Sequence, residues 1–183
     1  KKNIKLFNKK PLIYWTIKLA KESNLGQVCV TTDCKIIQKY ALSLGVDAPF
    51  IRPKSLSKDN TPIEPVIKHA INFYKNKKKI FFDSFFLLQP TSPFRKTKNI
   101  IDAIKLYKKK NYSSIFSVSE ATANNNPHWM LKKNIKNKPV KFTDGGKLEN
   151  LITRRQLLPK VYYRNDFVYL SSVKNIFTKT SNL

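Results

Sequence analysis

Cysteine is scarce in this sequence, and long apolar runs are missing. The only cysteines are Cys29 and Cys34, at the end of an expected strand and in the following helix. Two cysteines in this setting give neither a disulfide framework nor a zinc-ligand pattern. No apolar stretch reaches the ~18 residues of a membrane span, and the visible start has no secretory signal pattern. The sequence therefore favours a reducing, cytoplasmic compartment and no membrane partner.

Acidic residues are also scarce, since 11 Asp and Glu stand against 36 Lys and Arg, and the formal net charge is +25. Such a charge would suit a nonenzymatic module that binds a polyanion. Only five of the basic residues are arginines, however, and the lysines are spread along the whole chain. Specific DNA readers favour arginine forks, and no zinc finger, clear helix-turn-helix or RNA-binding aromatic signature occurs. We therefore expect solvated lysine faces and no nucleic-acid partner.

Short apolar segments alternate with segments of helical periodicity along most of the chain. Pro11 and Pro62 fit the first turns of helices, and Gly45 fits a helix stop. The alternation predicts an α/β fold with a doubly wound, mainly parallel sheet, in one domain of residues 1–183. The expected strands are 28–30, 48–51, 85–88, 114–118, 161–163 and 167–170. The expected helices are 11–24, 34–44, 62–75, 97–109 and 173–177.

Residues 120–160 differ in character from the rest of the chain. Short apolar groups are separated by polar turns, with a break at Asn124–Pro127 and a turn signal at Asp144–Gly146. We interpret residues 124–160 as an inserted, hairpin-like arm that is too irregular to form its own core. Its apolar side chains, exposed together, would mark an interface. We therefore predict a two-fold symmetric homodimer in which each arm lies across the other subunit.

The most informative segment is Leu87–Arg95, which reads LLQPTSPFR. An apolar run ends there in two prolines, which exclude continuation as a helix or a central strand. Polar loops outside the carboxyl ends of buried strands are where open α/β sheets bind ligands. Gln89, hydroxyl groups and the fork of Arg95 would suit a sugar or a nucleotide. The alternative is an ordinary strand-to-helix turn in which Ser92 or Thr97 caps the helix.

This segment resembles the LLQPTSPLR signature of the bacterial cytidylyltransferases for sialic, legionaminic and pseudaminic acids, and Phe94 is the one change. The resemblance continues in order along nearly all of the chain. The other matching segments are Lys2-Asn3, Thr31–Asp33, Arg52-Pro53 with Asp59 and Thr61, Pro127–Met130, Arg154–Pro159 and Asn165–Tyr169.

The resemblance implies a nucleotide-diphospho-sugar transferase fold of Rossmann-like type, with the arm as a dimerisation element. It also implies transfer of CMP from CTP to the anomeric hydroxyl of a nine-carbon sugar acid, with release of pyrophosphate. The implied catalytic residues are Lys2 and Gln89. The implied nucleotide-binding residues are Lys2, Asn3, Arg52 and Thr61, and the implied substrate-binding residues are Gln89, Ser92, Arg155, Gln156, Asn165 and Tyr169. A related nucleotidyltransferase with another acceptor, such as 3-deoxy-octulosonate, is the alternative enzyme.

Several of these residues also have ordinary structural interpretations. Lys2 could be one more surface lysine, Arg52 a loop cation, and Arg155 part of a surface arginine pair. Tyr169 could belong to the core of the sheet. Asp33, at the end of the Thr31–Asp33 segment, is best interpreted as a helix cap.

The sequence departs from the family pattern at three points. The glycine-rich phosphate loop would precede Lys2, and the late D-x-D segment that helps hold Mg²⁺ would follow Leu183. We therefore expect Mg²⁺ as a cofactor with its main ligands outside this chain, and we expect the chain alone to be inactive. Asp166 replaces the family's glycine, and aspartate tolerates a positive φ better than most residues if that position requires one.

Overall fold

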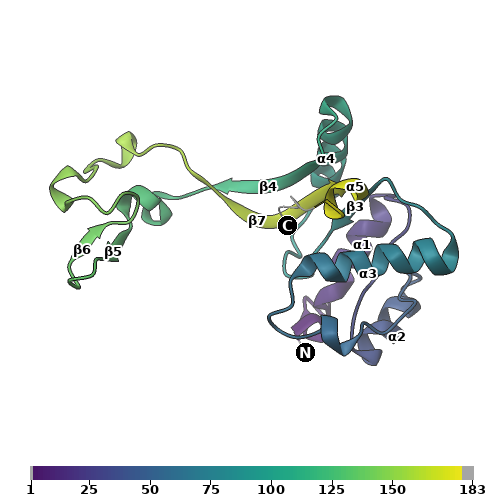
Figure 1. Ribbon diagram of the computed structural model, residues 1–183. Coiled ribbons are helices and arrows are strands. Elements are labelled where there is room, and N and C mark those ends of the chain that lie inside the picture. Colours follow the sequence, from purple (N-terminus) through teal and green to yellow (C-terminus); the bar gives the residue numbers. More distant parts are fainter. Residues whose placement is uncertain (1, 179–183) are drawn as a thin grey trace. The chain divides into compact units, whose positions relative to one another are not determined.

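The structure is a computed structural model that describes residues 2–178. The chain divides into two compact units (Figure 1). Unit 1 comprises Lys1–Phe116 and Asp166–Leu183, and unit 2 comprises Ser117–Asn165. The described helices are α1 (Leu12–Glu22), α2 (Lys35–Ser43), α3 (Ile63–Phe73), α4 (Thr97–Lys110) and α5 (Val173–Ile176). The described strands are β1 (Leu6–Phe7), β2 (Lys10–Pro11), β3 (Ser84–Leu87), β4 (Ser114–Glu120), β5 (Leu131–Lys133), β6 (Pro139–Lys141) and β7 (Tyr162–Ser172).

Helix α1 joins the two apolar clusters of unit 1. Ile13 and Ile17, one turn apart, lie in a cluster with buried side chains of α2 and of the segment after it. Leu19 lies on the opposite side of the helix, because two residues along an α-helix correspond to a rotation of roughly 200°, and it packs with Ile100 of α4 and Val168 of β7. The predicted helix is confirmed, and Trp15, which belongs to neither cluster, is half-buried.

The predicted ends of the helices are mostly correct. Gly45 follows α2 with φ +71°, and its N–H donates to Leu42 O at 2.9 Å, as a glycine stop requires. Helix α4 ends at Lys110, and its C-cap, Asn111, also has a left-handed conformation with φ +50°. Helix α3 begins one residue later than expected, since Pro62 is its N-cap, and it continues into a π-helical turn at Tyr74–Lys78.

The sheet differs from the prediction of a mainly parallel arrangement. Strand β7 pairs with β3 in antiparallel fashion, with Leu87 opposite Tyr169, and β4 lies on the other side of β7 (Figure 1). In the described residues, the parallel relation occurs only as isolated bridges from Cys29 to Asp47 and from Thr32 to Ile51. The α/β class is therefore confirmed, and the parallel ladder is reduced because segments 28–32 and 47–52 exchange few backbone hydrogen bonds.

Unit 2 is organised by hydrogen bonds rather than by a core. Strands β5 and β6 form an antiparallel hairpin. The Asn126 side chain is buried, donating to Pro159 O and accepting from His128 N. The Trp129 indole donates to Ile152 O at 2.6 Å. Residues 117–165 are all described, and none of their apolar side chains is buried.

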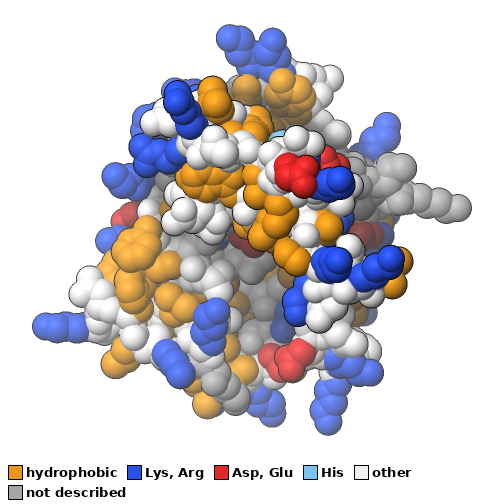
Figure 2. Space-filling view, turned by 90° about the vertical axis from the view of Figure 1, so that its left-hand side faces the viewer, with side chains coloured by type: hydrophobic (Ala, Val, Ile, Leu, Met, Phe, Trp, Pro, Cys, Tyr) orange, Lys and Arg blue, Asp and Glu red, His pale blue; other side chains and the backbone are white. Residues whose placement is uncertain are grey.

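Figure 2 shows how basic side chains are distributed on one face of the molecule. On the face shown in Figure 2, lysine and arginine side chains are scattered and separated by hydrophobic and other groups. Polyanion binding needs basic groups clustered in a patch or stripe, and the solvated lysine faces expected from the sequence stay a prediction. None of the helices within residues 2–178 combines the length and the apolar character that crossing a bilayer would require.

Candidate functional site

Arg52 directly follows the parallel bridge between Thr32 and Ile51, and its side chain has a defined orientation. Its backbone N–H donates to Thr32 O at 2.8 Å, which places it beside the Thr31–Asp33 segment. Its Nε donates to Ser57 Oγ at 3.2 Å, and its NH2 atom lies 3.9 Å from Asp33 Oδ1. The Arg52 side chain is 21% exposed, so it remains accessible to a ligand. The geometry therefore presents a half-buried guanidinium at the carboxyl end of these segments, where such sheets bind ligands.

Asp33 has a different role from the expected helix cap. The N-cap of α2 is Cys34, and its N–H donates to Thr32 Oγ1 at 3.1 Å. The Asp33 carboxylate instead faces Arg52. Because the neighbouring threonine supplies the local hydrogen bond, Asp33 is free to act as the counter-charge that orients Arg52.

The remaining expected nucleotide-binding residues also lie in unit 1. Lys2 is exposed and Asn3 is half-buried in a 3-10 helix at Lys2–Ile4. Ile4 anchors this turn, because it packs against the cluster of Ile13 and Ile17. Thr61 is half-buried just before α3, and its N–H donates to Lys58 O at 3.0 Å.

The loop after β3 is fixed by a buried arginine. Gln89 and Ser92 are half-buried, whereas Arg95 is only 7% exposed. The Arg95 guanidinium donates to Gln89 O at 2.6 Å, to Asp166 O at 3.2 Å and to Phe167 O, and it lies 3.4 Å from Thr16 Oγ1. Arg95 is therefore not available to bind a sugar or a nucleotide, contrary to the sequence-based expectation.

Burial of the guanidinium changes its acidity. Desolvation lowers the pKa of Arg95 to about 10, because the charged form loses its water, while the charge of nearby Asp166 acts in the opposite direction. The partners that do form hydrogen bonds with Arg95 are backbone carbonyls and one hydroxyl. Arg95 thus remains charged at neutral pH and is surrounded by these neutral hydrogen-bond acceptors.

The segment Asn165–Tyr169 contains two of the expected substrate-binding residues, Asn165 and Tyr169. It also contains Asp166, which stands where the family pattern has glycine. Asp166 has φ +52°, so the position where the family pattern has glycine does adopt a left-handed conformation. The Asn165 amide accepts from Ser117 Oγ at 2.5 Å and donates to Ser119 Oγ at 2.7 Å. Tyr169 is 5% exposed and packs against Phe85, so the structure places it in the core rather than on a surface that binds substrate.

Arg155 and Gln156 belong to unit 2. They are exposed and lie in a short 3-10 helix at Arg155–Leu157. No hydrogen bond or ion pair within the described residues occupies the Arg155 guanidinium. Its fork therefore remains open to an anionic ligand, for which a bidentate carboxylate is the best geometric match.

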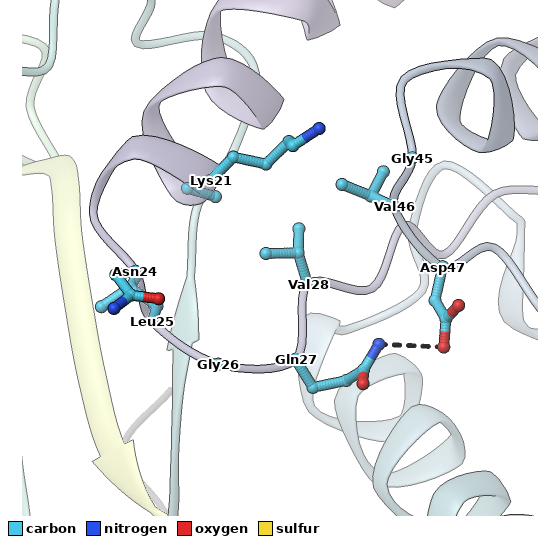
Figure 3. Close-up of a pocket in the computed structure, with 10 residues that line it drawn as sticks. Lys21, Asn24, Leu25, Gly26, Gln27, Val28, Gly45, Val46 and Asp47 are labelled. Carbon is cyan, nitrogen blue, oxygen red and sulfur yellow. Dashed lines mark hydrogen bonds between the residues drawn. The ribbon is translucent and has the colours of Figure 1, made fainter.

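A pocket of about 280 Å³ lies elsewhere in unit 1 (Figure 3). It is lined by Lys21, by Asp47 and by segments just before the two bridged strands. Figure 3 shows the Gln27 amide directed at Asp47, to which it donates at 2.9 Å, and the Lys21 ammonium donates to Leu44 O. The pocket is at the amino ends of these segments, opposite the edge at which Arg52 lies, and its charged groups are already paired.

The described residues can be compared with the pattern of a metal site made by protein side chains alone. Residues 2–178 contain no group of three or more His, Cys, Asp or Glu side chains that could hold a metal ion. Mg²⁺ often binds through only one or two carboxylates together with substrate phosphates, so the expected Mg²⁺ stays a prediction. The described site residues themselves can bind and orient a ligand by hydrogen bonds and positive charge.

Comparison with known proteins shows which family this arrangement represents. Residues 1–179 match the family model described as Cytidylyltransferase. The chain belongs to the cytidylyltransferase family. The resemblance in the sequence motifs is thereby confirmed, and with it the class of nucleotidyltransferases.

Two similar proteins are enzymes of this family. The chain is 38% identical over 133 residues to an N-acylneuraminate cytidylyltransferase of Escherichia coli, which covers 72% of this chain and 30% of that protein. It is 33% identical over 185 residues to a CMP-N,N'-diacetyllegionaminic acid synthase of Legionella pneumophila, which covers 98% of this chain and 75% of that protein. The chain therefore spans less than a third of one relative and three quarters of the other.

A solved structure shares the fold. CMP:2-keto-3-deoxy-manno-octonic acid synthetase complexed with CTP superimposes with a TM-score of 0.64, over 93% of this chain and 67% of that chain. The two sequences are 13% identical. The similarity shows the α/β nucleotidyltransferase fold.

Proposed function

We propose that this chain forms most of the core of an enzyme that transfers CMP from CTP to the anomeric hydroxyl of a nine-carbon sugar acid. The family match over residues 1–179 carries this proposal. In the reaction, the sugar hydroxyl attacks the α-phosphorus of CTP, and pyrophosphate leaves with the electrons of the broken P–O bond. The protein contributes by positioning and charge stabilisation.

The proposed roles follow the accessibility of each side chain. Lys2, exposed at the start of the chain, supplies a positive charge to the triphosphate, and Asn3, Arg52 and Thr61 bind the nucleotide. Asp33 supports the proposal because it orients Arg52 without covering it. Gln89 and Ser92, half-buried in the loop after β3, bind the sugar acid. Mg²⁺ is proposed from the family resemblance and would bind through carboxylates outside residues 2–178.

The proposed assembly is a homodimer. Unit 2 has no buried apolar side chain, yet Leu131, Phe142 and Leu157 are each about half-exposed or more. An irregular unit without a core gains stability when such groups are covered. We propose that a second copy covers them and that Arg155, with Gln156, then takes part in binding the sugar acid of the partner subunit. Asn165 stays a predicted substrate-binding residue.

The test is pyrophosphate release by the complete gene product with CTP, Mg²⁺ and each of sialate, legionaminate and pseudaminate. Release with one of these acids is expected. Release only with 3-deoxy-octulosonate would favour the related enzyme, and preferential binding of UTP or GTP would favour another nucleotide. Salt-sensitive binding of DNA without any pyrophosphate release would favour a polyanion-binding module.

Replacing Arg52 with alanine is expected to raise KM for CTP about tenfold or more, because a hydrogen bond to a charged group contributes about 1.5–3 kcal/mol. KM for the sugar acid should change little. Lys54→Ala is the matched control, since it removes an exposed positive charge two residues away. Steady-state kinetics in which both variants behave alike would show that Arg52 acts only through general charge.

A further inference from the structure

Arg95 is the least exposed charged side chain within the described residues. It is 7% exposed, although Thr91 and Phe94 of the same loop are exposed. A buried charge is costly unless it is well paired. No carboxylate in the described residues lies within ion-pair distance of Arg95, so its retention needs an explanation other than a buried salt bridge.

The partners of Arg95 join three segments that are far apart in sequence. Its NH2 atom donates both to Gln89 O at 2.6 Å and to Asp166 O at 3.2 Å, and its Nε donates to Phe167 O. Its NH1 atom lies 3.4 Å from the Thr16 hydroxyl in α1. The first of these carbonyls belongs to the residue that begins the QPTSP loop. The next two belong to the left-handed turn in β7.

Only a guanidinium can satisfy this set of acceptors. It presents five N–H donors in one rigid plane, whereas a lysine ammonium is a compact group on a flexible stem. Four acceptors on three segments therefore fix the plane of Arg95, and Arg95 in turn fixes where the backbone of Gln89 lies relative to β7. The carbonyls that accept from Arg95 carry no net charge, so they attract the guanidinium less strongly than a carboxylate would. Their effect is to fix the position of the guanidinium relative to the three segments.

We infer that Arg95 is a positioning residue of the sugar-acid site, which holds the backbone of Gln89 against the turn at Asp166 and Phe167. This inference rests on the proposed function, because it assigns Gln89 to the sugar acid. The backbone at Asp166 supports it, since this residue adopts a left-handed conformation (φ +52°) and its carbonyl accepts a hydrogen bond from Arg95. The consequence is that loss of Arg95 should misplace Gln89 and leave the Arg52 region intact.

The experiment measures KM and kcat for CTP and for the sugar acid in the complete gene product. Arg95→Lys and Arg95→Met are compared with wild type. Arg95→Lys keeps the charge, and Arg95→Met keeps a long side chain but leaves the carbonyls that Arg95 binds without a donor. Melting temperatures of both variants therefore establish first which of them is folded. We expect kcat/KM for the sugar acid to fall about 10- to 100-fold in either variant, as for a displacement of about 1 Å. KM for CTP should stay within about twofold of wild type.

Tyr74→Phe is the control for a purely structural effect. Tyr74 is 2% exposed and donates to Asp47 Oδ2 at 2.9 Å, and it shares no partner with Arg95. This variant should lower the melting temperature and leave both KM values unchanged. Two outcomes overturn the inference while the proposed function stands. In the first, a folded Arg95 variant keeps the wild-type kcat/KM for the sugar acid. In the second, kcat/KM for CTP and kcat/KM for the sugar acid fall by the same factor. A wild-type protein that releases no pyrophosphate overturns the proposed function and the inference together.

Discussion

Replacing Arg155 with alanine should reduce kcat/KM for the sugar acid by about 30-fold to a few thousand-fold, corresponding to roughly 2–5 kcal/mol. The reason is that a sugar-acid carboxylate would lose its bidentate partner, while CTP carries no group that Arg155 is proposed to bind. KM for CTP should therefore stay near the wild-type value. Arg154→Ala is the matched control, since it removes the same charge from the adjacent exposed residue.

Mixing two inactive variants tests whether the site is shared between subunits. A heterodimer of Arg155→Ala and Gln89→Ala subunits would contain one intact composite site. Mixed samples should thus regain activity that neither parent shows, up to about half of the wild-type activity per heterodimer. Sedimentation as a monomer at micromolar concentration, or no recovery on mixing, would show that Arg155 acts within its own subunit or only as a surface charge.

Ile100→Ala should destabilise the fold by about 2–5 kcal/mol, as for other buried Ile-to-Ala changes. Ile100 is fully buried (0% exposed) in the cluster of Leu19 and Val168, which joins α1, α4 and β7. The free energy of unfolding from denaturant titration measures the effect. Ile101→Ala is the control, because that neighbouring side chain is 41% exposed and its loss should change stability by roughly 0.5 kcal/mol or less. Equal effects of the two changes would show that the cluster is not the core of unit 1.

The elements that the sequence predicts well are those whose pattern is local. Helices α1, α2 and α4 have clear apolar periodicity, and Gly45 marks a helix end by its own backbone preference. The apolar run forms β3, which ends at Leu87, before the prolines of the loop, as expected. These features depend on neighbours within one or two turns, so a single sequence contains them.

The arrangement of the strands depends on distant residues and was predicted less well. Val28–Val30 is apolar and resembles a strand, but it forms only bridges with the segment at Asp47. The two short segments expected around residues 161–170 form one strand, β7, which continues through the left-handed Asp166. Periodicity does not reveal which partner a strand finds or whether a turn interrupts it.

The candidate site shows the same division. Motif order predicted that the loops of Arg52 and Gln89 belong to one nucleotidyltransferase fold. It did not predict that Arg95 turns inward, because its partners at Asp166 and Phe167 lie 71 and 72 residues away in the chain. Nor did it predict that Asp33 faces Arg52, since an aspartate before a helix is usually a cap. Both residues act through contacts that only the folded chain creates.

The most direct test of the account is formation of a CMP-sugar by the complete gene product. The protein would be incubated with CTP, Mg²⁺ and one nine-carbon sugar acid, and the product would be identified by mass spectrometry and phosphorus NMR. The account predicts one CMP–sugar acid conjugate and one pyrophosphate per CTP consumed, with far less product from Arg155→Ala and Arg95→Met. No conjugate with sialate, legionaminate or pseudaminate, in a protein that binds CTP, would contradict it.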